Sequence, residues 1–212
     1  MRELVKEFNI CAEKNLIEIG LKKQSQGIHF YPVDNDRFGW VGLNKSTKYR
    51  EIYLIPSIGI GLKSVQEFYY KIRGYKPKKD LISITGTTLE ALTNKKYKSC
   101  WISSNEEIIS EVSKLKSFLV SDAIPFIKKN ANLDNIIDLM VNRNYGFAEQ
   151  NAYFIPICYH LSGQDQLAIE KLNLRYESIK DHTYKAADNY RDFYTNFLKF
   201  LEDGSFPPIS EK

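Results

Sequence analysis

The most strongly patterned stretch in the first two thirds of the chain runs from Ser104 to Ile127. On a helical wheel its apolar residues form one stripe: Ile108, Ile109, Val112, Leu115, Leu119, Val120, Ala123, Phe126 and Ile127. Such a stripe predicts a helix that covers a core. Ser104 and Glu107 have the spacing of a capping box at its start. Pro125 cannot donate a helical hydrogen bond, so we expect a kink or a restart near Asp122 to Ile124.

A second pattern, with a period of two, runs from Tyr49 to Leu62. One side of this stretch carries its apolar set, which comprises Ile52, Leu54, Ile58, Ile60 and Leu62. This alternation predicts an antiparallel strand with one face on a core, in which Pro56 marks a bulge, a bend or an edge position. Shorter strands are expected at Ile28–Tyr31 and Phe38–Leu43, which form a hairpin, and at Leu81–Thr85 and Tyr97–Ser103.

Helical periodicity and stop signals predict further helices on both sides of these strands. The first covers Arg2 to Ile19 and ends at Gly20, and a short one opens on Ser64 and Glu67 and ends at Gly74. The others are expected at Leu133–Val141, Phe147–Leu161, Gln166–Ile179 and Tyr184–Leu201. The chain is therefore predicted to be α+β, with an antiparallel sheet of four to five strands covered on one face by helices. Residues 1–145 would form this domain, and residues 146–212 a C-terminal helical extension packed on it.

The composition indicates the general class of protein and its cellular location. The chain is 43% hydrophobic and 26% charged, which is ordinary for a globular protein, and its apolar runs are shorter than the ~20 residues of a spanning helix. The amino end lacks the apolar core of a secretory signal. We therefore expect a cytoplasmic protein that does not enter a membrane. Cys11, Cys100 and Cys158 are few and far apart, so they are interpreted as buried thiols without a disulfide or a metal.

The residues that usually carry enzyme chemistry do not form a recognisable constellation. His29, His160 and His182 have no acid or cysteine at ligand spacing, and His160 is interpreted as a core histidine with a satisfied hydrogen bond. Asp34 and Asp36 suit a hairpin turn better than a calcium loop. We expect no catalytic residue, metal or cofactor. An enzyme would require a pocket with converging polar groups near His29 or Arg37.

Positive charge is concentrated between Lys63 and Cys100. Nine bases and three acids give this segment +6, which leaves −2 for the rest of the chain. Within it Lys71, Arg73, Lys76, Lys78 and Lys79 alternate with Tyr69, Tyr70 and Tyr75. Cations beside aromatic rings can bind single-stranded nucleic acid, which is the alternative function. A solvated loop in a lysine-rich chain would have the same sequence pattern, and we favour the solvated loop over nucleic-acid binding.

The order of elements resembles a family of small bacterial α+β domains that carry a domain-of-unknown-function label. In that family a helix ends in a Gly-Phe-Lys-Lys-like turn, precedes an amphipathic meander and is followed later by a kinked helix. The matching motifs are Ile19-Gly20-Leu21-Lys22-Lys23, Ile28-His29-Phe30-Tyr31, Trp40 to Ser46, Ala123-Ile124-Pro125-Phe126 and Asn132-Leu133-Asp134. The resemblance covers Met1 to Asn142. Ala152, Tyr159, Leu161, Gly163 and Ala168 give the tail a tetratricopeptide-like hairpin.

Because members of such families occur near toxin systems, the resemblance implies an immunity or partner-binding role and transfers no catalytic residues. We expect a non-enzymatic protein that binds another macromolecule, such as a toxin, with aromatic anchors on the second face of the meander. The candidate binding residues are Arg37, Trp40, Tyr49, Tyr53, Arg73 and Lys78. Its net charge of +4 does not suit the basic active site of a nuclease toxin. The sequence does not indicate an oligomeric state.

Overall fold

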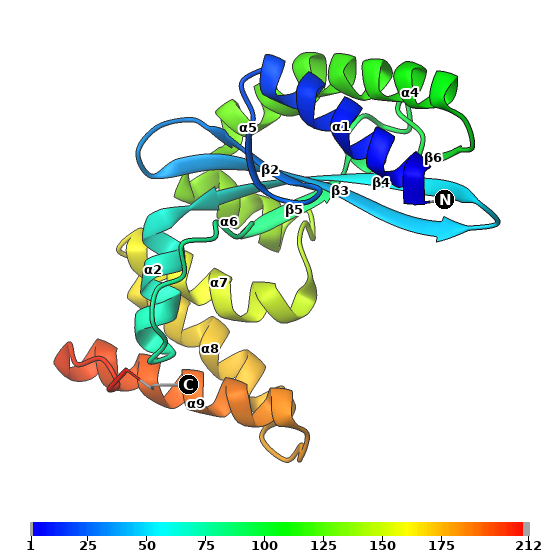
Figure 1. Cartoon of the computed structure of the whole chain (residues 1–212). Helices are drawn as coiled ribbons and strands as arrows, with labels where there is room; N and C mark the ends of the chain where they lie inside the picture. The colour runs from blue at the N-terminus through cyan, green and yellow to red at the C-terminus, as the bar shows by residue number, and fades with distance from the viewer. Residues whose placement is uncertain (1, 210–212) are drawn as a thin grey trace. The chain divides into compact units, whose positions relative to one another are not determined.

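A computed structural model describes residues 2–209 and confirms the α+β fold class (Figure 1). The strands are β1 (Lys22–Ser25), β2 (Ile28–Pro32), β3 (Arg37–Lys48), β4 (Glu51–Leu62), β5 (Thr85–Thr88) and β6 (Cys100–Ile102). The helices are α1 (Arg2–Glu18), α2 (Lys63–Ile72), α3 (Leu89–Leu92), α4 (Asn105–Phe118), α5 (Ile124–Asn130), α6 (Leu133–Val141), α7 (Ala148–Leu161), α8 (Asp165–Ile179) and α9 (Lys185–Asp203). Within this part of the chain no helix is long and apolar enough to cross a membrane.

The described strands form one antiparallel sheet of six, one more than the upper limit of the prediction. Its order is β1-β2-β3-β4-β5, and β6 pairs with β4. Both β5 and β6 lie along the same edge of β4, because Ile60 accepts a hydrogen bond from Ile84 at this edge and Leu54 pairs with Cys100. Pro56 falls in the gap between these two pairings, although β4 itself is an inner strand of the sheet.

Three helices cover one face of this sheet. In Figure 1, α1 (blue) and α4 (green) lie side by side over the strands, and Lys116 of α4 pairs with Glu18 of α1 at 2.6 Å. Ile127 of α5 packs against Gly39 of β3. The apolar set of β4 that includes Ile52 and Ile58 is almost completely buried. The predicted layer arrangement is therefore confirmed.

The stretch from Ser104 to Ile127 is helical but changes its hydrogen bonding before the proline. Ser104 caps α4 by accepting a hydrogen bond from the Glu107 amide, as predicted. Residues 119–123 form a π-helical turn in which Ile124 donates to Leu119, five residues back. Pro125 then stands in the first turn of α5. Pro125 lacks the N–H group that an α-helix would use at this position. The wider π-helical turn just before it accommodates this loss, so the helix continues past the proline.

Some burial predictions for these helices are wrong. Ile109 and Val120 are predicted to lie on the covered stripe between Ser104 and Ile127, but Ile109 is 66% exposed and Val120 is 50% exposed. In α1 the apolar Ile17 is 52% exposed, because this helix packs through Phe8, Ala12 and Leu16. Each helix thus has a narrower buried stripe than its apolar residues alone indicate.

The chain divides into two compact units, each of which is described here by itself. The sheet unit comprises Met1–Gly61 and Leu81–Ala131, and the helical unit comprises Leu62–Asp80 and Asn132–Lys212. This division differs from the boundary expected after residue 145, because α2 and α6 belong to the helical unit. Tyr69 of α2 packs its ring on Tyr153 and Phe154 of α7, with ring centroids 5.7 and 5.3 Å apart. Tertiary packing therefore places α2 with helices that follow much later in the chain.

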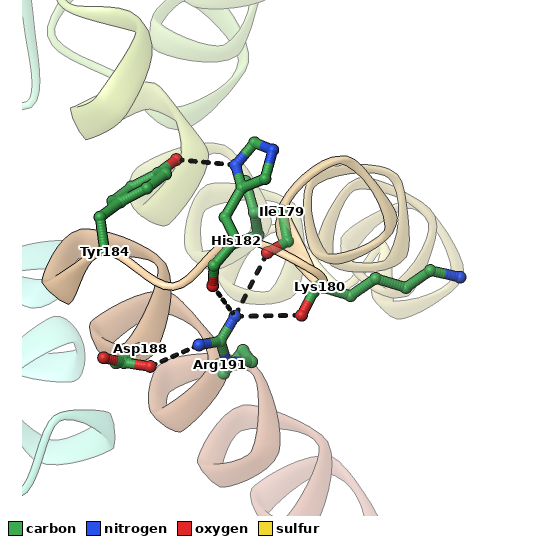
Figure 2. A network of polar contacts seen from close by, with 6 residues as sticks. All are labelled: Ile179, Lys180, His182, Tyr184, Asp188 and Arg191. Carbon is green, nitrogen blue, oxygen red and sulfur yellow. Dashed lines mark hydrogen bonds and ion pairs between the residues drawn. The ribbon is translucent and has the colours of Figure 1, made fainter.

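The turn between α8 and α9 is held by Arg191, as Figure 2 shows. One guanidinium nitrogen donates to the carbonyl oxygens of Ile179, Lys180 and His182 at 3.2, 3.2 and 2.9 Å, and the other donates to Asp188. The last carbonyls of a helix lack intrahelical donors, so this cation satisfies the end of α8 and opposes its dipole.

Arg191→Met should lower the free energy of unfolding by about 1–2 kcal/mol, since several carbonyls lose a charged donor in a partly exposed turn. Chemical denaturation followed by far-ultraviolet circular dichroism measures the loss. Asp188→Asn is the matched control, because it removes one partner of the arginine and leaves the carbonyls capped. An equal loss in both variants would show that the ion pair matters more than the cap.

Candidate functional site

A groove of about 590 Å³ lies in the sheet unit between α1 and the strands β1, β2 and β3. Arg2, Val5, Lys6, Asn9, Ile10 and Glu13 of α1 line one side. Lys23, Gln26, Gly27, His29 and Leu43 line the other. The volume falls in the range that holds small-molecule ligands in proteins.

His29 forms part of the inner wall of this groove. Its cross-strand neighbours are Lys23 on β1 and Val41 on β3. The residue is 2% exposed, and neither ring nitrogen has a hydrogen-bond partner within the described residues. A buried polar group without a partner costs free energy, so such a group requires an explanation. Burial lowers the pKa of His29, and the nearby charges of Lys23 and Lys45 lower it further against the opposing effect of Glu13.

The walls of the groove carry more positive than negative charge. Arg2, Lys6 and Lys23 contribute three cations, and Glu13 contributes one carboxylate that binds Lys23 at 2.6 Å. Just outside the lining, Lys45 donates to the side-chain oxygen of Asn9 and lies 5.0 Å from the ring centroid of Phe8. Burial lowers the pKa of Lys45. The groove is therefore a basic site with apolar patches.

Aromatic residues gather on the opposite face of the sheet. A hydrogen bond of 2.8 Å between Asn44 of β3 and Ser57 of β4 places these residues, and those that alternate with them, on this face. Trp40 lies over Gly42, where a side chain would meet the indole ring. Tyr53 packs on Trp101 of β6 with ring centroids 4.7 Å apart. Trp101 is 46% exposed, so this face presents an aromatic pair to solvent.

The β3–β4 hairpin ends in an unusual two-residue turn. Tyr49 and Arg50 have φ values of 51° and 69°, in the left-handed region that Asn and Gly adopt most readily. Tyr49 is 82% exposed, and Lys48 lies 4.8 Å from its ring centroid. We call Lys48, Tyr49 and Arg50, together with Tyr53 and Trp101, the hairpin surface.

The structure brings only some of the candidate binding residues together. Trp40 and Tyr53 share one sheet face, and Tyr49 lies at the tip of the same hairpin. Arg37 stands at the other end of β3, where its guanidinium binds Asp34 at 2.5 Å and the carbonyl of Ala131 at 3.4 Å. Arg37 is thus part of the β2–β3 turn. Residues Arg73 and Lys78 belong to the helical unit.

The basic segment of the helical unit does not present three free tyrosines. Tyr70 is buried, and Tyr69 packs within the core of this unit. Arg73 donates to the hydroxyl of Tyr75 at 2.5 Å, and its guanidinium lies 6.0 Å from the ring of Tyr69 and 5.5 Å from that of Tyr153. Tyr75, Lys76, Lys78 and Lys79 are exposed. The aromatic and cationic residues thus stabilise the end of α2 more than they form a stacking platform.

The remaining candidate chemistry is structural. His160 makes the hydrogen bond expected for it, because its Nδ1 lies 2.7 Å from Oδ1 of Asp165, which accepts, and its ring centroid lies 5.0 Å from that of Phe68. The three cysteines are free, and burial raises the pKa of the Cys100 thiol to about 12. Among residues 2–209 no group of three or more His, Cys, Asp or Glu side chains is arranged to hold a metal ion.

Sequence reasoning missed two parts of these sites. Trp101 lies in the predicted strand Tyr97–Ser103, and its place opposite Tyr53 follows only from the β4–β6 register. The groove draws residues from α1 and three strands, so no local motif marks it. The one available signal was His29, a polar residue in an otherwise apolar strand that the structure places on the covered face.

Comparison with known proteins found no matching family model, curated protein or solved structure.

Proposed function

We propose that this protein is a non-enzymatic binding protein that recognises another protein through the hairpin surface. The observation that carries the proposal is the exposed tip at Tyr49 and Arg50. Two bulky residues occupy backbone conformations that cost each of them about 1 kcal/mol or more, and the tyrosine side chain is left in solvent. A fold that needed only a tight turn would be more stable with Asn and Gly there.

The chemistry of the hairpin surface supports a protein partner. The few residues that dominate the binding energy of protein interfaces are enriched in Trp, Tyr and Arg, and Trp101, Tyr49 and Arg50 present one of each. Asn44 and Ser57, on the same sheet face as Tyr53, add polar groups of the kind that form the rim of an interface. Such a surface recognises by shape and aromatic contact and requires no reaction.

The charge of the tip indicates the kind of partner. Lys48 and Arg50 flank Tyr49, and Glu51 is the acid next to them in the chain. A basic tip complements an acidic or polar surface and repels the basic active site of a nuclease. The immunity-type role implied by the family resemblance is therefore proposed for a toxin with an acidic face.

Photo-crosslinking in the native cell tests this proposal. A photoreactive phenylalanine analogue replaces Tyr49 in one variant and Trp101 in another, and Leu174, 67% exposed on α8, is the control position. The same protein should be captured at both test positions and be absent from the control. With the purified partner, Trp101→Ala should weaken binding about 30-fold or more, as expected for a central aromatic anchor. Different captured proteins at the two positions would contradict a single interface.

Replacing the hairpin tip should separate stability from binding. Tyr49→Asn combined with Arg50→Gly should raise the free energy of unfolding by about 1 kcal/mol, because both residues tolerate the left-handed region. The same variant should bind the captured partner more weakly. Chemical denaturation measures the change in the free energy of unfolding, provided that its dependence on denaturant concentration is the same in the variant and the wild type. Lys48→Asn, outside the left-handed positions, should give no gain in stability.

Nucleic-acid binding by the segment from Lys71 to Lys79 is tested separately. Affinity for single-stranded oligonucleotides is measured over a range of salt concentrations, in the wild type and in Lys78→Gln. True phosphate contacts require a steep fall of affinity with salt and a smaller slope in the variant. A shallow slope that Lys78→Gln leaves unchanged removes this alternative.

A further inference from the structure

We propose that the groove between α1 and the strands β1–β3 is a binding site for a small organic phosphate monoester, with His29 at its inner wall. This site is on the α1 face of the sheet, whereas the hairpin surface lies at the tip and on the other face. The inference is therefore independent of the protein-binding role proposed above.

The charge of the lining selects the ligand class. Three cations, Arg2, Lys6 and Lys23, face one carboxylate, Glu13, and the balance of +2 matches a dianion. A phosphate monoester carries a charge of about −1.5 to −2 near neutral pH and three strong acceptor oxygens. Lys6 and Arg2 come from the same helix one turn apart, so both can reach one phosphate. Lys23 is already bound by Glu13 and closes the other side of the groove.

The buried imidazole of His29 distinguishes this groove from an ordinary basic surface. Its ring is buried at the groove wall with two unpartnered nitrogens, one of which carries a proton in the neutral form. An anion in the groove would accept a hydrogen bond from that N–H after a small movement of the wall. Ligand binding would then give a partner to the donor that the protein itself leaves without one.

The rest of the lining and the size of the groove favour an ester over a free ion. Val5, Ile10 and Leu43 provide apolar walls beside the cations. A cavity of about 590 Å³ is much larger than a phosphate ion and can hold a sugar or a small ring attached to it. The shared chemistry is a phosphate on a compact body, and nucleotides and sugar phosphates are two sources of it.

The imidazole also makes the affinity of the groove depend on pH. The other charged groups near His29 are Glu13 on α1, Lys23 on β1 and Lys45 on β3, with Arg2 and Lys6 farther along α1. Because the pKa of His29 is lowered, the ring is neutral at neutral pH and gains its charge only in more acidic solution. Binding of an anion should tighten as the pH falls through the pKa of His29.

Imidazole NMR on the complete chain tests the site with phenyl phosphate as the probe. The three histidines give separate signals, so His160 and His182 serve as internal controls. The expected result is a saturable shift of the His29 resonances alone. Arg2→Gln and Lys6→Gln should each weaken binding about three- to tenfold, since each removes one nearby charge. Phenyl sulfate, whose charge is constant with pH, should bind more tightly near pH 5 than near pH 7.

Matched variants decide between this site and general charge attraction. Lys95→Gln removes the same charge from an exposed turn of the sheet unit and should leave the affinity unchanged. His29→Leu should remain folded and should lose both the binding and its pH dependence. Should that variant fail to fold, His29→Gln and the wild-type titration still test the site. Shifts at all three histidines, equal weakening by Lys95→Gln, or full affinity without His29 would overturn the proposal.

Discussion

Phe193→Ala should lower the free energy of unfolding of the helical unit by about 3–5 kcal/mol, the largest loss we expect from a single side chain here. Phe193 of α9 is completely buried. Its ring centroid lies 4.9 Å from that of Tyr153, 5.7 Å from Tyr190 and 5.6 Å from Phe197. Truncation removes the ring that joins α7 to α9 and leaves a cavity that rigid aromatic neighbours cannot fill.

Two probes separate the response of the helical unit from that of the sheet unit. Both tryptophans, Trp40 and Trp101, lie in the sheet unit, so their fluorescence reports on it, whereas far-ultraviolet circular dichroism is dominated by helices. Phe147→Ala is the matched control, because that phenylalanine is 75% exposed and its loss should cost less than about 0.5 kcal/mol. If Phe193→Ala costs no more than the control, the aromatic cluster is not the core of this unit.

Local signals in the sequence were sufficient for most of the helices. Gly20 and Gly74 adopt positive φ at the helix ends that the sequence predicts for them, and Gly163 does the same after α7. Ser104 and Asn132 cap their helices through their own side chains. These features depend on neighbours within a few residues, which is the range over which sequence patterns carry information.

Prediction failed where distant contacts decide the structure. Ser64 was expected to cap α2, but β4 runs directly into that helix, Leu62 occupies the cap position without a side-chain hydrogen bond, and Ser64 lies inside. The strand β1 consists of polar residues only and is absent from the predicted strands, because its strand character comes from backbone pairing with β2. The strand expected at Leu81–Thr85 begins only at Thr85. There Gly86 approaches the Ile58 carbonyl of β4 so closely that no side chain would fit.

The candidate sites show the same limit. Trp40, Tyr49 and Tyr53 are predicted from alternation along one hairpin, which places Trp40 and Tyr53 on one face of the sheet and Tyr49 at its tip. Its partner residue Trp101 is 48 positions farther along than Tyr53 and enters only through strand pairing. The groove at His29 requires the packing of α1 over β1–β3, which no spacing in the sequence encodes. Local patterns thus identify surfaces within an element, and tertiary contacts create the sites between elements.

A double-mutant cycle at Gly39 and Ile127 should reveal a strong coupling between α5 and the sheet. A Cβ atom on Gly39 would lie 2.8 Å from Cγ2 of Ile127, whose side chain is fully buried. Gly39→Ala should therefore cost about 1–3 kcal/mol through overpacking. Ile127→Ala should cost about 2–5 kcal/mol through the cavity it leaves.

In the double variant the new methyl group occupies space that the isoleucine has vacated. Its loss should be smaller than the sum of the two single losses by about 1 kcal/mol or more, as measured by the denaturation midpoint of tryptophan fluorescence. Gly39→Ala with Val120→Ala is the control, since Val120 is half exposed and the atoms nearest to a Cβ on Gly39 all belong to Ile127. That pair should be additive. Additivity in the Gly39–Ile127 pair as well would mean that α5 shifts to relieve the clash. A positive coupling energy would show that α5 packs closely on the sheet at a fixed position, and that this packing requires a residue without a side chain at Gly39.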